Sequence, residues 1–142
     1  MSISEIHCAD DIADLAREAV QQVRITKQYR DLISAVLMAN HVADWYYGKS
    51  FGDPQRDAMK ARYPEWDAIR KIANGTKHCK KKAQANYDDT EWEDSDYWES
   101  TGHVGDDGCD WFIDFGGQRR SVVVLIETFL KDFSDQSSRP SF

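Results

Sequence analysis

Residues 29–48 read YRDLISAVLMANHVADWYYG, and this stretch decides the fold class. Its apolar residues recur every three or four positions, which is the period of an α-helix. Val42, Trp45 and Tyr46 add hydrophobic side chains on further faces of that helix. Because a helix that is apolar on several faces is buried among other elements, we predict that this stretch is the central helix of a bundle. Gly48 is a natural end for it.

The chain on both sides of the central helix also has helical periodicity. Residues 12–23 carry an apolar stripe at helical spacing, with Asp10 or Asp11 placed as the N-cap. Asp53 and Pro54 suit the N-cap and the first turn of a short helix further along the chain. We therefore predict a helix on each side of the central one.

A further helix is expected to begin after Tyr63–Pro64, because proline interrupts a helix but is tolerated in a first turn. Asn74–Gly75 either ends this helix or bends it before residues 76–85 continue as a helix, and the sequence leaves both open. The apolar residues expected on its inward face are Trp66, Ile69, Ile72 and Ala73.

The chain changes character after the helical part and predicts a β-hairpin. Residues 110–115 alternate in polarity as a half-buried strand does, and we expect a strand at 109–115. With the turn residues 105–108 they suggest a hairpin whose other strand is 98–104 and which Gly116–Gly117 ends. The side chains expected on its inward face are Trp111, Ile113 and Phe115.

Residues 121–133 predict the last helix. The valine-rich start also suits a strand, but the length and the Glu127–Lys131 pair favour a helix. We expect Phe129 and Phe133 to pack with the inward face of the hairpin against the central helix at Val36, Leu37 and Ala43.

The predicted fold is mainly α: a single domain with a bundle of four or five helices and one β-hairpin inserted before the C-terminal helix. Its expected parts are the helical bundle at 1–85, an acidic aromatic segment with the hairpin at 86–118, the C-terminal helix at 119–135 and a frayed tail at 136–142.

Composition excludes several classes of protein. Hydrophobic residues make up 41% and aromatic residues 12% of the 142 residues, so the chain is not a disordered tail. No apolar run is long enough for a membrane span, and the first residues lack the regions of a signal peptide. Three cysteines without a CxxC pair suggest reduced thiols. We therefore expect a cytoplasmic protein without membrane contact.

The net charge of −7 is unevenly distributed. Residues 83–118 contain 11 Asp or Glu and no Lys or Arg, whereas the rest of the chain has a balance of +4. Residues 70–82 hold a cluster of Lys and Arg directly before this acidic stretch. Two interpretations stay open: the basic cluster binds nucleic acid, or it pairs with the acidic stretch.

The segment RKIANGTKH, residues 70–78, resembles the motif region of HEPN proteins, the higher eukaryote and prokaryote nucleotide-binding domains. Asn74 and His78 match the polar and histidine positions of that motif, whereas Ala73 stands where the family has arginine. Arg70 lies one helical turn away. The resemblance implies a helical bundle with ribonuclease activity, or an inactive relative, of the kind found in toxin–antitoxin and phage-defence systems.

This segment contains the side chains that metal-free RNA cleavage needs. Such cleavage uses a histidine to move a proton at the 2′-hydroxyl and a cation beside the phosphate. His78 with Asn74, Arg70 and Lys77 would supply them. The structural alternative is that Asn74–Gly75 is a helix terminus and His78 an ordinary surface residue.

The acidic aromatic segment is the least ordinary part of the sequence. Indole and phenol rings give contact area, while carboxylates steer a basic partner towards them. The alternative is a solvated loop whose aromatic residues pack on the bundle. The residues expected to bind a partner are Asp88, Asp89, Glu91, Trp92, Glu93, Asp94, Asp96, Tyr97 and Trp98.

The sequence favours a non-enzymatic binding or inhibitory protein that uses this acidic surface against a basic protein or a nucleoprotein complex. The alternative is a HEPN-like ribonuclease acting on RNA through Asn74 and His78. Neither function calls for a cofactor, and the spacing of His, Cys and Asp fits neither zinc nor calcium ligands. A homodimer stays open.

Overall fold

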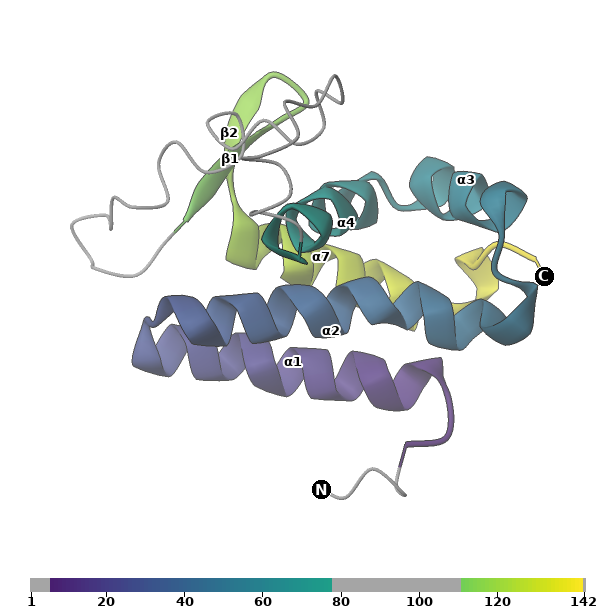
Figure 1. The fold of residues 1–142 in the computed structure, drawn as a ribbon, viewed down its shortest axis with the longest axis horizontal. Coiled ribbons are helices and arrows are strands. Elements are labelled where there is room, and N and C mark those ends of the chain that lie inside the picture. The colour runs from purple at the N-terminus through teal and green to yellow at the C-terminus, as the bar shows by residue number, and fades with distance from the viewer. Residues whose placement is uncertain (1–5, 78–110, 142) are drawn as a thin grey trace.

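A computed structural model describes residues 6–77 and 111–141 of the chain. In these residues five α-helices surround a common core, and a two-stranded antiparallel hairpin precedes the last helix (Figure 1). The predicted fold class is therefore confirmed. The elements are α1 (Ala9–Thr26), α2 (Tyr29–Tyr47), η2 (Gly48–Ser50), α3 (Asp53–Arg62), α4 (Pro64–Lys77), β1 (Phe112–Phe115), β2 (Gln118–Ser121), α7 (Val122–Ser134) and η4 (Gln136–Ser138).

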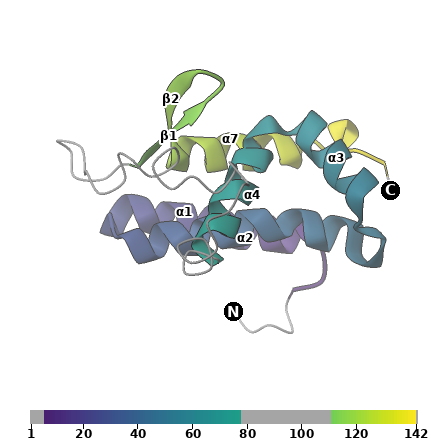
Figure 2. The same ribbon diagram turned by 45° about the horizontal axis from the view of Figure 1, so that its top comes forward.

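The helices are arranged in two layers. The antiparallel helices α1 and α2 form one layer, and α4 and α7 pack on it as a second layer (Figures 1 and 2). Helix α2 contacts each of the other four α-helices, which confirms that it is the central helix. The hairpin rises from the end of the bundle at which α7 begins (Figure 2). Within the described residues, every helix is too short or too polar to cross a membrane.

The start of α1 differs from the prediction. The N-cap is Cys8, and Asp11 lies in the first turn of the helix. The Asp11 carboxylate accepts hydrogen bonds from the backbone N–H groups of His7, at 2.7 Å, and Cys8, at 3.2 Å. The bond from His7 is the main reason why the pKa of Asp11 lies below its usual value. Asp11 thus stabilises the helix start from inside the helix rather than as its N-cap.

The start of α3 is displaced in the same way. Gly52 is the N-cap, so that Asp53 and Pro54 occupy the first two helical positions. The side chain of Gln55, the third helical residue, accepts the backbone N–H of the N-cap Gly52 at 3.0 Å, as in one half of a capping box. Helix α4 continues through Asn74–Gly75, so this pair does not end the helix.

The hairpin turns at Gly116 and Gly117. Both have positive φ angles, 59° and 80°, as a type I′ turn between two strands requires. Phe112 pairs with Ser121, and Phe115 pairs with Gln118. The prediction that the two glycines end the hairpin is therefore wrong, because they join its strands. The expected strand 98–104 and turn 105–108 lie outside the described residues.

The inward face of the hairpin anchors the start of α2. The Trp111 ring lies 6.3 Å from the ring of Tyr29, the first residue of α2. The Phe133 ring of α7 lies 5.7 Å from that of Tyr46, near the end of α2 and thus about 25 Å further along the helix axis. The inward faces of the hairpin and of α7 therefore belong to one core, as predicted, but they contact opposite ends of α2. The inward residues of the hairpin are the predicted ones: Trp111 and Ile113 are buried, and Phe115 is half-buried.

The segment after α7 docks on the bundle. The Arg139 guanidinium donates to the carbonyl of Phe133 at 2.8 Å and to Asp10 of α1 at 2.6 Å. It also lies 3.8 Å from the centre of the Phe133 ring. The Tyr46 hydroxyl donates to the carbonyl of Pro140 at 2.5 Å. The prediction of a frayed tail is therefore wrong as far as the structure describes it.

Truncating Trp111 tests the role of the hairpin in stability. Trp111 is 3% exposed, so Trp111→Ala should lower the free energy of unfolding by about 3–5 kcal/mol. Trp45 is 41% exposed on α2, and Trp45→Ala should cost less than about 1 kcal/mol. Denaturant unfolding of both variants measures the difference. A larger loss in Trp45→Ala would contradict the anchoring of α2 by the hairpin.

Candidate functional site

A polar cleft between α2, α3 and α4 contains two of the residues that the sequence singled out. Arg70 and Asn74 lie one turn apart on α4, and both line this cavity of about 240 Å³. Lys77 is the last residue of α4, and His78 lies outside the described residues. The acidic aromatic segment at 88–98 also lies outside them. The structure thus places half of the four-residue motif in one hollow.

Three further elements complete the cleft. Helix α2 contributes polar residues from the middle of its apolar sequence, which is a signal that sequence reasoning missed. Helix α3 contributes an arginine, and the turn after η2 contributes an aromatic ring. The additional lining residues are Asn40, His41, Asp44, Phe51, Arg56 and Trp66.

His41 and Asp44 form a hydrogen-bonded pair at the rim. The Nδ1 atom of His41 lies 3.0 Å from a carboxylate oxygen of Asp44, and both side chains are half exposed. A carboxylate beside Nδ1 favours the tautomer with its proton on that nitrogen. The Nε2 atom then remains available to accept or transfer a proton. A histidine held in this way is a group for general acid–base chemistry.

Arg70 is held in place from outside the cleft. Its Nε and Nη2 atoms donate to one oxygen of Asp67, at 3.2 and 3.0 Å. The Nζ atom of Lys71 lies 3.5 Å from the other oxygen of the same carboxylate. Both cations at the start of the basic cluster therefore share an acidic partner within α4. This pairing reduces the positive charge that α4 offers to nucleic acid.

Arg56 is positioned by its own helix and by an aromatic stack. Its Nη1 atom donates to Asp53 at 2.5 Å, and its guanidinium lies 5.4 Å from the centre of the Phe51 ring. The Phe51 ring stacks in turn on Tyr47, with 5.7 Å between the ring centres. These contacts hold a guanidinium at the mouth of the cleft.

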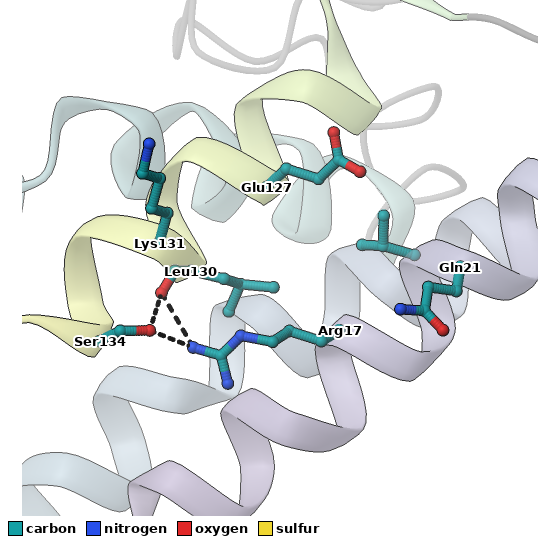
Figure 3. A pocket seen from close by; sticks show the side chains of 7 residues that line it. Arg17, Gln21, Glu127, Leu130, Lys131 and Ser134 are labelled. Carbon is teal, nitrogen blue, oxygen red and sulfur yellow. Dashed lines mark hydrogen bonds between the residues drawn. The ribbon is translucent and has the colours of Figure 1, made fainter.

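A second hollow, between α1 and α7, is a structural seam. Arg17 reaches across from α1 and donates to the Leu130 carbonyl at 3.0 Å and to Ser134 at 2.5 Å (Figure 3). Glu127 pairs with Arg24 of α1 at 2.6 Å, so the expected pair with its neighbour four residues on is not formed. Arg17 and the Arg24–Glu127 pair thus join the two helices across this hollow.

Comparisons with known proteins assign no function to the cleft. No protein-family model, no curated protein and no solved structure matches the chain. Within the described ranges, 6–77 and 111–141, no three His, Cys, Asp or Glu side chains are grouped as a metal site. The likeness to HEPN proteins stays a prediction from the sequence.

Neutralising the carboxylate that Arg70 and Lys71 share should destabilise α4. The side chains of Arg70 and Asp67 are only 14% and 22% exposed, so Asp67→Asn should cost roughly 1–3 kcal/mol in the free energy of unfolding. Asp57→Asn makes the same charge change at an exposed position of α3 and should cost less than about 0.5 kcal/mol. Equal losses in thermal or denaturant unfolding would contradict a holding role for Asp67.

Proposed function

We propose that the chain is a non-enzymatic binding protein whose acidic aromatic segment, residues 88–98, docks on a basic partner. The observation that carries this proposal is the location of the charge. Residues 78–110 contain ten Asp or Glu and three Lys, so this part alone has a net charge of −7. The described residues contain 15 Lys or Arg and 14 Asp or Glu and are nearly neutral. The helical body therefore acts as a scaffold for one strongly charged segment.

Internal pairing of the body supports the proposal. Five of the nine arginines among the described residues already hold acidic partners of their own, so these five are engaged within the body rather than with the segment. Counterions or a basic partner then neutralise the negative charge of the segment. The pairs are Arg17–Asp14, Arg24–Glu127, Arg56–Asp53, Arg70–Asp67 and Arg139–Asp10.

The chemistry of the segment defines the partner as a basic protein or a basic surface of a nucleoprotein complex. Carboxylates raise the association rate with a positive surface, whereas tryptophan and tyrosine rings supply most of the contact energy once they are covered. The three cysteines without a CxxC pair favour a reducing compartment, so we place this interaction in the cytoplasm.

Charge reversal tests the segment directly. Changing Asp88, Asp89, Glu91 and Asp94 to Lys should weaken binding to a partner captured from cell extract, and weaken it more at low salt than at high salt. The reason is that exposed charges act over about 10 Å at 0.1 M salt and over less at higher concentration. Capture with and without nuclease treatment separates a protein partner from one held through nucleic acid.

A control with the same change in net charge makes this test specific. Glu18, Asp57, Glu65 and Asp132 lie on the helices, and the same four-fold reversal there should leave the affinity within about twofold, because these charges do not belong to the segment proposed to bind. Equal weakening by both variants, or an affinity of the segment variant that is unchanged at every salt concentration, would reject this surface. A lower melting temperature without lost binding would instead indicate an internal charge pair.

A ribonuclease acting on RNA is the second candidate, and one observation favours it. Arg70 and Asn74 share their cleft with His41, so that a cation, an amide and a proton-carrying imidazole lie together. These are group types that metal-free cleavage of a phosphodiester uses. Ala73 at the arginine position of the resembling motif ranks this candidate below binding.

The ranking predicts the outcome of a nuclease assay. Purified protein should cleave single-stranded RNA no faster than background in the presence of a metal chelator, because the resembling motif lacks its arginine at Ala73. The matched variants are His78→Ala and His41→Ala. Cleavage that one of these variants abolishes would reverse the ranking and would also identify the histidine that moves the proton.

A further inference from the structure

The cleft between α2, α3 and α4 has the features of a ligand site. Its lining combines two guanidinium groups with an imidazole and two carboxamides, contributed by three different helices. The side-chain amides of Asn40 and Asn74 make no hydrogen bond within the part of the chain that the structure describes. Half-buried amides without a protein partner are available to a bound molecule.

We infer that this cleft binds a phosphate group, with Arg56 and His41 as its main donors and Arg70 as a second positive charge. The planar guanidinium matches the oxygen atoms of phosphate, because two N–H groups can donate side by side. The Nη1 atom of Arg56 donates to Asp53, and its Nε and Nη2 atoms also carry N–H groups that can donate. In the imidazolium form of His41, Nδ1 donates to Asp44 and Nε2 can donate to a phosphate oxygen, and the amide groups can donate to the remaining oxygens.

Arg70 contributes charge at a defined position. It lines the cleft, whereas its acceptor Asp67 does not and instead holds the guanidinium from the other side. A ligand entering the cleft therefore meets the arginine already ordered, which lowers the entropic cost of binding. Asp44 is the carboxylate that lines the cleft, and its bond to His41 orients the imidazole.

The size of the cleft limits the ligand. Its volume of about 240 Å³ lies below the roughly 300–1,000 Å³ typical of pockets for drug-sized molecules. Either free phosphate or the single phosphate group of an ester fits this limit, the rest of an ester lying outside the cleft. The aromatic lining adds little stacking area, because Phe51 already lies between Tyr47 and Arg56 and Trp66 is buried.

This inference is independent of the proposed binding function, since it uses no residue of the acidic segment. The test is a titration of the full chain with inorganic phosphate, followed by amide NMR at constant ionic strength. We expect saturable shifts at residues of α2, α3 and α4 that line the cleft. The absence of saturable shifts there would overturn the inference, whatever the acidic segment binds.

Matched variants separate a built site from general attraction to positive charge. Arg56→Gln should weaken phosphate binding about tenfold, the loss expected for one charged hydrogen-bonding partner. Arg56→Lys keeps the positive charge but loses the planar guanidinium, so its affinity for phosphate should lie between those of Arg56→Gln and the unchanged chain. Arg30→Gln removes the same charge from an exposed position at the start of α2 and should leave the affinity unchanged. Equal weakening by Arg30→Gln and Arg56→Gln would also overturn the inference.

Two esters identify the source of the phosphate group. Methyl phosphate represents a monoester, such as the end of a nucleotide, and dimethyl phosphate represents the diester of a nucleic-acid backbone. Tighter binding of either ester than of inorganic phosphate, again weakened by Arg56→Gln, supports the site and assigns its class. If dimethyl phosphate binds more tightly than the monoester, the cleft is the place at which RNA would be held.

Discussion

The close packing of α1 against α2 is the constraint on which the rest of the structure depends. It is the most extensive contact between any two described elements. Small side chains at buried positions let two helix backbones approach closely. Both helices contribute alanines that are fully buried in the core. Once α1 covers one face of α2, the other apolar faces of α2 must be covered by α4 and α7. The buried alanines are Ala13, Ala16, Ala35, Ala39 and Ala43.

This arrangement leaves a polar strip of α2 facing α3 and α4, and the strip forms one wall of the cleft. Asn40, His41 and Asp44 lie on rigid helical backbone, so the groups that would hold a phosphate are ordered before a ligand arrives. The charge of the chain lies elsewhere, in residues 78–110 between α4 and β1. One bundle thus supports two separable features, a small polar cleft and an acidic segment.

Errors in predicting the element boundaries have a common physical origin. Asp10, Asp11 and Asp53 all have side chains suited to an N-cap, and the sequence offered no means of choosing among neighbouring positions. At α1 the choice is made by the carboxylate of Asp11, which accepts two N–H groups from inside the helix. The tail was predicted to fray because it is polar, yet Arg139 finds a ring, a carbonyl and a carboxylate that only the folded bundle brings together.

The sequence by itself determined the helices, the strand before the last helix, their inward faces and the concentration of negative charge. These features depend on local period and composition, which a linear pattern records. Only the tertiary structure decided which polar residues meet. Asn40 and Asn74 are 34 positions apart, and Arg139 and Asp10 are 129 apart, so no spacing rule links either pair. Their meeting depends on which faces of separate helices pack together, and the burial of side chains from the whole bundle sets that choice.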